Sequence, residues 1–98
     1  MKDRLTEKKR DDQLAPLFRT GWQMVEGRDA IHKTFVFTSF VEAFGWMTKI
    51  AIRAEKMNHH PEWANVYRTV DIYLTTHEVQ GVSDRDFDLM DAINRIIA

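Results

Sequence analysis

The sequence contains no cysteine, and this absence excludes disulfide bonds, thiolate nucleophiles and zinc–thiolate sites. It also lacks an excess of one charge sign, because 14 Lys and Arg stand against 15 Asp and Glu, for a formal net charge of −1. Direct binding to nucleic acid or to an anionic membrane is therefore not expected. No apolar run approaches the roughly 20 residues that cross a bilayer. We expect a soluble, cytoplasmic protein whose stability comes from packing.

Proline and glycine are also scarce. Two prolines and four glycines occur in 98 residues, whereas 44% of the residues are hydrophobic and 11% are aromatic. This composition is typical of a chain with an apolar core, and it excludes disordered and collagen-like classes. A chain of this length is sufficient for one core and too short for two. The sequence shows no internal repeat or linker, so we expect a single domain over residues 1–98.

The hydrophobic pattern predicts seven elements in the order α-β-β-α-β-β-α. The expected strands are residues 22–26, 31–37, 65–67 and 70–77, and the expected helices are residues 7–14, 40–57 and 84 to the C-terminal end. Ser39 with Glu42, and Ser83 with Asp86, have the spacing of capping boxes that start the two longer helices. We predict an α+β domain, in which a four-stranded antiparallel sheet has three helices packed on one face.

The helix at residues 40–57 carries more apolar surface than a small sheet needs. We expect its core stripe to consist of Phe40, Phe44, Met47, Ala51 and Ala54, widened by Ala43, Trp46, Ile50 and Met57. Val41 and Ile52 lie outside that stripe, and another subunit that covers the helix would explain them. Trp22 and Trp46 are expected in the core.

Three of the four histidines are predicted to converge, because His59 and His60 follow the long helix and His77 ends the last strand. Imidazole titrates near neutrality, so the cluster offers both a proton donor and a proton acceptor. Glu55, four residues before His59, can orient or charge-stabilise that ring. Two other interpretations stay open, namely a polar turn without chemistry and a metal site that would also use Glu62.

Other residues have simpler interpretations. His32 lies in the first hairpin with only Lys33 as a titratable neighbour, and we expect it to be an exposed strand residue without a role. Trp63 can wall a flat ligand near the histidines, although core packing also explains it. The sequence has neither a glycine-rich phosphate loop nor a nucleophile elbow around its serines.

The segment from Glu55 to Tyr67, E-K-M-N-H-H-P-E-W-A-N-V-Y, and the Thr76–His77 pair after it resemble the pterin-4a-carbinolamine dehydratases. The resemblance covers nearly the whole chain from about Leu5. It implies three helices on one face of a four-stranded antiparallel sheet, dimers that join sheets and tetramers that pair the long helices. The implied reaction is loss of water from a 4a-hydroxytetrahydropterin to give quinonoid dihydropterin, within tetrahydropterin recycling and with no metal or other cofactor.

The resemblance also implies roles for individual residues. His59 and His77 would be the acid–base pair at the 4a-hydroxyl and the ring nitrogen, in either order, and His60 would hold and polarise the pterin. Substrate contacts are implied for Asn58, Pro61, Trp63, Thr75, Thr76 and Glu78, and a supporting role for Glu55 and Asp86. Family members often carry Asp at the position of Asn58. Some relatives instead act as dimerisation cofactors of a homeodomain transcription factor, so a helical or transcription-factor partner is the alternative function.

Overall fold

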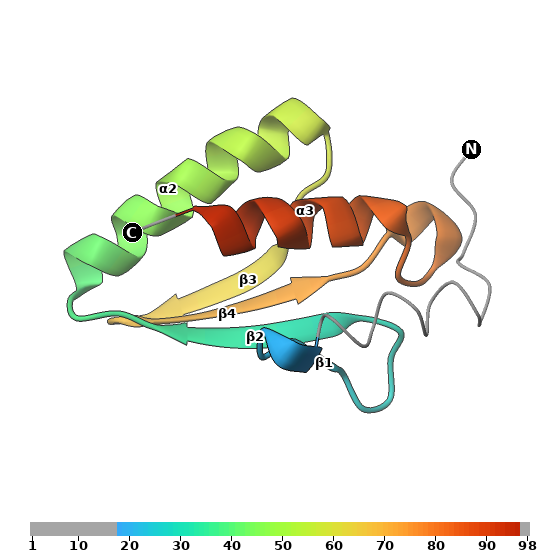
Figure 1. Ribbon diagram of the computed structural model, residues 1–98, viewed down its shortest axis with the longest axis horizontal. Coiled ribbons are helices and arrows are strands. Elements are labelled where there is room, and N and C mark those ends of the chain that lie inside the picture. The colour runs from blue at the N-terminus through green and yellow to red at the C-terminus, as the bar shows by residue number, and fades with distance from the viewer. Residues whose placement is uncertain (1–17, 97–98) are drawn as a thin grey trace.

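The computed structural model describes residues 18–96 (Figure 1). Its elements are β1 (Gln23–Met24), β2 (Ile31–Val36), α2 (Phe40–Met57), β3 (Glu62–Val66), β4 (Thr69–Leu74), the 3-10 helix η1 (His77–Val79) and α3 (Asp84–Arg95). The helix predicted at residues 7–14 lies outside the described residues. Within residues 18–96, no helix combines the length and the apolarity needed to span a membrane.

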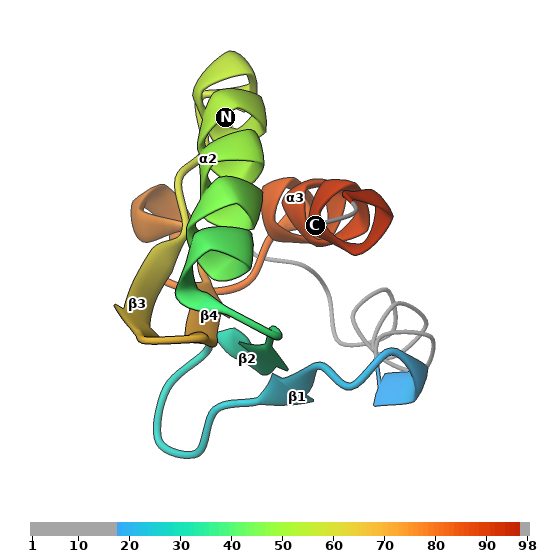
Figure 2. The same cartoon turned by 90° about the vertical axis from the view of Figure 1, so that its left-hand side faces the viewer.

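The four strands form one antiparallel sheet in the order β1-β2-β4-β3. In this register, His32 of β2 and Glu62 of β3 both lie opposite Tyr73 of β4. The helices α2 and α3 cover the same face of the sheet (Figures 1 and 2). The α+β class and the antiparallel sheet predicted from the sequence are therefore confirmed.

The core lies between the sheet and the two helices, and two tryptophans tie these layers together. Trp22 and Trp46 are both buried, as predicted. The indole N–H of Trp22 donates to Oδ1 of Asn94 in α3 at 3.0 Å, and that of Trp46 donates to the carbonyl oxygen of Ile96 at 3.1 Å. Each large ring thus buries its apolar surface while its single polar atom keeps a partner.

The buried face of α2 differs from the predicted one. Its buried residues are Ala43, Trp46, Ile50 and Ala54. Phe40 and Phe44, which the sequence placed in the core, are 47% and 55% exposed. Two neighbouring arcs of this helix are apolar, and hydrophobic periodicity alone does not rank them. Packing decides between them, because the Trp46 ring contacts the rings of Phe35 and Phe37.

Strands β1 and β3 also differ from their predicted ranges. β1 has two residues where five were expected, and β3 starts at Glu62, three residues before the predicted start at residue 65. The β3–β4 hairpin turns at Tyr67, which has a φ of 53°. The side-chain amide of Asn65 donates to the carbonyls of Tyr67 and Thr69 at 3.0 and 2.9 Å. Such hydrogen bonds from a side chain to the backbone stabilise a tight turn. β3 therefore continues to Val66, the residue before the turn.

β4 ends at Leu74, so the prediction that His77 ends this strand is wrong. Thr76 and Gly81 exchange two backbone hydrogen bonds of 2.9 and 3.2 Å, which close a small loop around η1. Gln80 ends η1 in the left-handed conformation, with a φ of 52°. His77 therefore projects from a tight helical turn and does not follow the strand alternation.

Candidate active site

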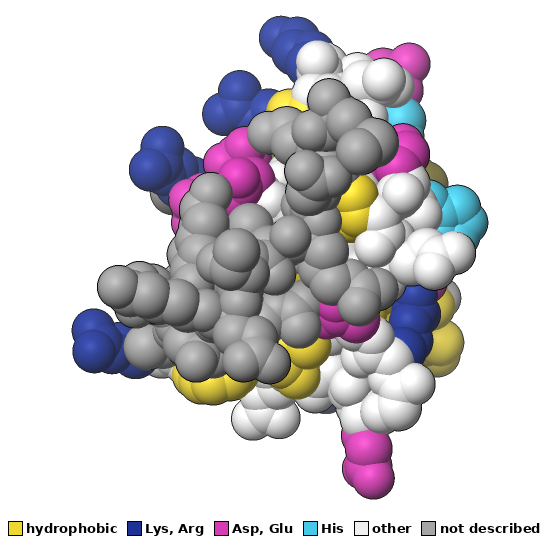
Figure 3. Space-filling view, turned by 90° about the vertical axis from the view of Figure 1, so that its right-hand side faces the viewer, with side chains coloured by type: hydrophobic (Ala, Val, Ile, Leu, Met, Phe, Trp, Pro, Cys, Tyr) yellow, Lys and Arg dark blue, Asp and Glu magenta, His cyan; other side chains and the backbone are white. Residues whose placement is uncertain are grey.

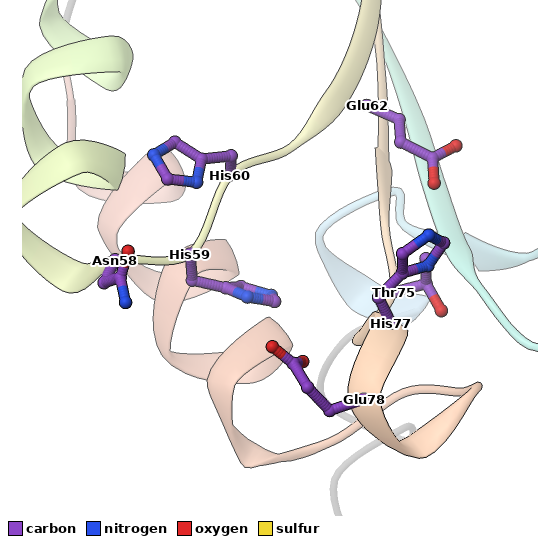
Figure 4. A pocket seen from close by; sticks show the side chains of 7 residues that line it. All are labelled: Asn58, His59, His60, Glu62, Thr75, His77 and Glu78. Carbon is purple, nitrogen blue, oxygen red and sulfur yellow. The ribbon is translucent and has the colours of Figure 1, made fainter.

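A pocket of about 410 Å³ opens where the end of α2, the start of β3 and η1 meet. It is lined by Asn58, His59, His60, Glu62, Thr75, His77 and Glu78. The structure thus brings the three predicted histidines to one pocket. His59 extends toward His77 and Glu78, whereas the ring of His60 turns back toward α2 (Figure 4). Figure 3 shows histidine side chains next to acidic side chains at the surface on this side of the molecule.

A left-handed turn at the end of α2 sends the two adjacent histidines in different directions. Asn58 has a φ of 52°, a conformation that asparagine tolerates better than most residues. Its backbone N–H and that of His59 each donate to a carbonyl in the last turn of α2 at 3.1 Å. Pro61 then favours an extended chain before it. As a result, His59 is buried and His60 is exposed.

A buried carboxylate holds His59. Nε2 of His59 lies 2.6 Å from Oδ1 of Asp86, and these side chains are 8% and 0% exposed. Asp86 lies in the first turn of α3, where its Oδ2 accepts hydrogen bonds from the Ser83 backbone N–H at 2.9 Å and the Thr76 hydroxyl at 2.6 Å. The Ser83 hydroxyl in turn accepts from the Arg85 backbone N–H at 3.3 Å. It also accepts from the Asp86 backbone N–H, which completes the predicted capping box.

Glu55 contacts a different histidine from the one predicted. Its Oε1 lies 2.8 Å from Nε2 of His60, and the two side chains are 80% and 57% exposed. The prediction that Glu55 orients His59 is therefore wrong. The helix ends at Met57, so the i, i+4 geometry of a helix does not extend to His59. A polar contact this exposed contributes little to stability, but it orients the His60 ring at the rim of the pocket.

Glu62 supplies a second carboxylate to the pocket. Nη1 and Nη2 of Arg28, in the β1–β2 hairpin, donate to its two oxygens at 3.0 and 3.1 Å. The hydrogen bonding from Arg28 has the largest effect and lowers the pKa of Glu62. Desolvation opposes it, and smaller electrostatic effects of Arg28 and the nearby His77 lower the pKa further. Sequence reasoning considered Glu62 only as a metal ligand. It missed Arg28 because the two residues are 34 positions apart.

Glu78 is a third carboxylate beside the histidines. A hydrogen bond from its own backbone N–H lowers its pKa, and the charge and hydrogen bond of Arg85 act in the same direction. Nη2 of Arg85 donates to Oε2 of Glu78 at 3.1 Å. Glu62 and Glu78 are therefore ionised at neutral pH, and their negative charges stabilise a positive charge that forms on a nearby imidazole. No pattern in the sequence pointed to the role of Arg85.

Three residues with implied substrate contacts do not line the pocket, namely Pro61, Trp63 and Thr76. Trp63 is half-buried and packs against the hydrophobic core. Thr76 is fully buried, and its hydroxyl is used by Asp86. Thr75 does line the pocket, and its hydroxyl donates to the backbone carbonyl of Asp29 at 2.9 Å, which links the β1–β2 hairpin to the site.

The geometry of the pocket is suited to proton transfer. Within residues 18–96, no three histidine, aspartate or glutamate side chains are grouped to hold a metal ion, so the metal set that included Glu62 does not form. His59 and His77 instead lie on different elements that face one pocket, and each imidazole can donate or accept a proton. The fold and the pocket define a small α+β domain suited to acid–base chemistry on a small molecule.

Comparison with known proteins places the chain in a family. Residues 3–96 match the family described as pterin 4 alpha carbinolamine dehydratase. A relative from Roseobacter denitrificans is 62% identical over 89 residues, which are 91% of this chain and 91% of the relative. A relative from Dinoroseobacter shibae is 55% identical over 96 residues, 98% of this chain and 99% of the relative. Both relatives are named for this dehydratase. The chain belongs to the pterin-4-alpha-carbinolamine dehydratase family.

A solved structure supports the same assignment. The crystal structure of a transcriptional coactivator/pterin dehydratase from Brucella melitensis superimposes with a TM-score of 0.90 at 44% sequence identity. The match covers 98% of this chain and 100% of that chain. The resemblance read from residues 55–67 is therefore confirmed as family membership, and the α+β fold of residues 18–96 matches that of this neighbour.

Proposed function

We propose that this protein is a dehydratase that eliminates water from 4a-hydroxytetrahydropterin, a carbon–oxygen lyase acting in tetrahydropterin recycling. The observation that carries the proposal is the placement of His59 and His77 on different elements around one pocket, in a chain of this family. The pocket volume of about 410 Å³ lies within the range of small-molecule sites. A cytoplasmic location and a single domain over residues 1–98 are further parts of the proposal, and cell fractionation tests the location.

The reaction needs one proton donor and one proton acceptor. The bond between C4a and the hydroxyl oxygen breaks, and the oxygen takes a proton and leaves as water. The neighbouring ring nitrogen loses a proton, and its electron pair forms the new C=N bond of the quinonoid product. No electrons are gained or lost overall, so the elimination requires no redox partner. Two imidazoles can supply both transfers, each worth on the order of 10²- to 10⁴-fold in rate.

The remaining residues of the site would bind the pterin. His60, oriented by Glu55, would hold and polarise the ring from the rim of the pocket. Substrate contacts are proposed for three further polar lining residues, Asn58, Thr75 and Glu78. Pro61 and Trp63 would act by shaping the turn and the core behind it, since neither lines the pocket.

An exposed apolar face on α2 supports a homo-oligomer. Phe40, Val41, Phe44 and Ile52 are between 47% and 80% exposed. Three of them, with Gly45, line a groove of about 350 Å³. We propose that a second copy covers this face, in a dimer or tetramer, because an apolar surface of this extent is costly in water. A transcription-factor helix, the alternative partner, would use the same face.

Sedimentation tests the oligomer. Wild-type protein is expected to sediment as a multiple of 11.6 kDa, and Val41→Glu to reduce that mass, because a carboxylate cannot be buried there without a partner. Val41→Thr, which keeps the side-chain volume, is the milder control. A wild-type protein that sediments as a monomer at all concentrations would remove the oligomer.

The ultraviolet decay of freshly generated 4a-hydroxytetrahydropterin tests the dehydratase. Wild-type protein should speed the decay, and His59→Ala and His77→Ala should each slow it by on the order of 10²- to 10⁴-fold. Circular dichroism checks that the variants are folded. Decay no faster than in buffer, with folded wild-type protein, would contradict the function and favour a binding role for the α2 face.

A further inference from the structure

Three polar side chains are fully buried behind His59, although the pocket does not touch them. Thr76, Ser83 and Asp86 each have 0% exposure. They come from the loop after β4 and from the start of α3. Buried polar groups are costly unless they are hydrogen-bonded, so their arrangement is a fixed part of the structure.

The donor and the acceptor of each hydrogen bond among these groups can be assigned. The Thr76 hydroxyl has a single proton, which it donates to Oδ2 of Asp86 at 2.6 Å. The 2.6 Å contact between the Thr76 and Ser83 hydroxyls must therefore be donated by Ser83. Ser83 itself accepts from the Arg85 backbone N–H at 3.3 Å. The series of hydrogen bonds therefore leads from the Arg85 backbone N–H through the hydroxyls of Ser83 and Thr76 to the carboxylate of Asp86.

This arrangement determines which imidazole nitrogen of His59 carries the proton. The Thr76 hydroxyl and the Ser83 backbone N–H both donate to Oδ2 of Asp86, and Oδ1 receives Nε2 of His59. These donors, together with the position of Asp86 in the first turn of α3, favour the ionised carboxylate, which can only accept. Nε2 of His59 therefore carries its proton, and in the neutral ring Nδ1 keeps the lone pair.

We propose that Thr76 and Ser83 are positioning residues, which hold Asp86 so that His59 presents Nδ1 as the proton acceptor. This inference rests on the proposed dehydratase function and assigns the two histidines. His59 Nδ1 takes the proton of the ring nitrogen, and Asp86 stabilises the imidazolium that forms. His77 gives its proton to the departing hydroxyl, which leaves as water as the C=N bond forms. Thr76 acts through Asp86 and does not contact the pterin.

The first test determines which ring nitrogen of His59 is protonated in wild-type protein without substrate. Long-range proton–nitrogen NMR on histidine labelled with ¹⁵N distinguishes a protonated ring nitrogen from a bare one. At a pH where His59 is neutral, we expect Nε2 to be protonated and Nδ1 to be bare. The opposite tautomer would overturn the proposal. This measurement needs no variant and no turnover, so it decides the arrangement even if the dehydratase function fails.

The second test removes one hydroxyl at a time. Thr76→Val should lower kcat by about tenfold or more with little change in KM, because a hydrogen bond to the charged carboxylate is lost. It should also give a mixture of His59 tautomers, and Thr76→Ser should restore both the rate and the spectrum. Thr34→Val is the matched control, because it removes a hydroxyl that donates to Asp71 on the sheet, and it should change neither. Wild-type rate and tautomer in Thr76→Val would overturn the proposal.

A third test distinguishes the proposed positioning role of Ser83 from its role as a helix cap. Ser83→Ala and Ser39→Ala each remove the N-cap of one helix, α3 and α2 respectively, and both should lower the melting temperature. Only Ser83→Ala should change the His59 spectrum and the rate. Equal spectra in the two variants would show that Ser83 is only a helix cap.

Discussion

Residues 18–96 contain two clusters that each combine a histidine, an aspartate and a threonine, in very different surroundings. In one, His59 lies 2.6 Å from Asp86, which also accepts from Thr76 at 2.6 Å. In the other, His32 lies 2.9 Å from Asp71, which also accepts from a threonine hydroxyl, that of Thr34, at 2.5 Å. The first histidine and carboxylate are 8% and 0% exposed, and the second are 30% and 36% exposed.

The difference shows that these residue types alone do not make a site. The exposed cluster shares one carboxylate oxygen between two donors, and water can replace either of them. Its histidine stacks on Tyr73 and does not line the pocket. In the buried cluster, Oδ1 of Asp86 contacts His59 and Oδ2 accepts from Thr76. His59 also lines the pocket. We therefore expect only the buried cluster to set the rate, and to respond strongly to the loss of any member.

The largest expected contrast in stability is between the two carboxylates. Asp86→Asn should lower the free energy of unfolding by about 3 kcal/mol, because it leaves buried donors without their charged acceptor. Asp71→Asn should lower it by less than about 1 kcal/mol, because water screens that cluster. Urea unfolding monitored by tryptophan fluorescence measures both values. Similar losses in the two variants would mean that burial does not distinguish the clusters.

The two threonines should show the same contrast on a smaller scale. Thr76→Val should cost about 1–2 kcal/mol, since the methyl group replaces a buried hydroxyl that has two partners. Thr34→Val should stay within about 0.5 kcal/mol, as surface substitutions usually do. Thermal unfolding gives the ranking directly, and an equal shift of the melting temperature in both variants would argue against it.

The smallest expected effect is a loss of folding stability at acid pH. The Thr34 hydrogen bond and then the His32 contact lower the pKa of Asp71 in the folded protein. A folded-state pKa below the unfolded value, about 3.9, stabilises the fold above that pH, and the gain is lost as the pH falls through the folded pKa. Asp71→Asn should therefore cost a few tenths of a kcal/mol at pH 7 and nothing near pH 2. Urea unfolding at both values checks this, and a cost that persists at pH 2 would assign it to packing.

Local signals predicted much of the fold. The bounds of α2 at Phe40 and Met57 and the Ser83 capping box follow from neighbouring residues, and the structure agrees with both. The gathering of the histidines was also predicted. The buried face of α2 was not, because two adjacent arcs are apolar and only the packing of Trp46 separates them.

The hydrogen-bond partners of the site were harder to predict. His59 meets Asp86 across 27 residues, and His32 meets Asp71 across 39. Such pairs depend on the sheet register and on the helix start, which no local pattern encodes. The family resemblance implied support from Asp86 but not which ring it holds. The left-handed turn at Asn58 similarly redirected Glu55 to His60.

The most direct test of the account compares the two histidines in one assay. The decay of 4a-hydroxytetrahydropterin is measured with wild-type protein, His59→Ala and His32→Ala at equal concentrations. We expect His59→Ala to lose on the order of 10²- to 10⁴-fold in rate and His32→Ala to match the wild type. Equal losses in both variants, or no loss in His59→Ala, would contradict the claim that the buried histidine carries the chemistry.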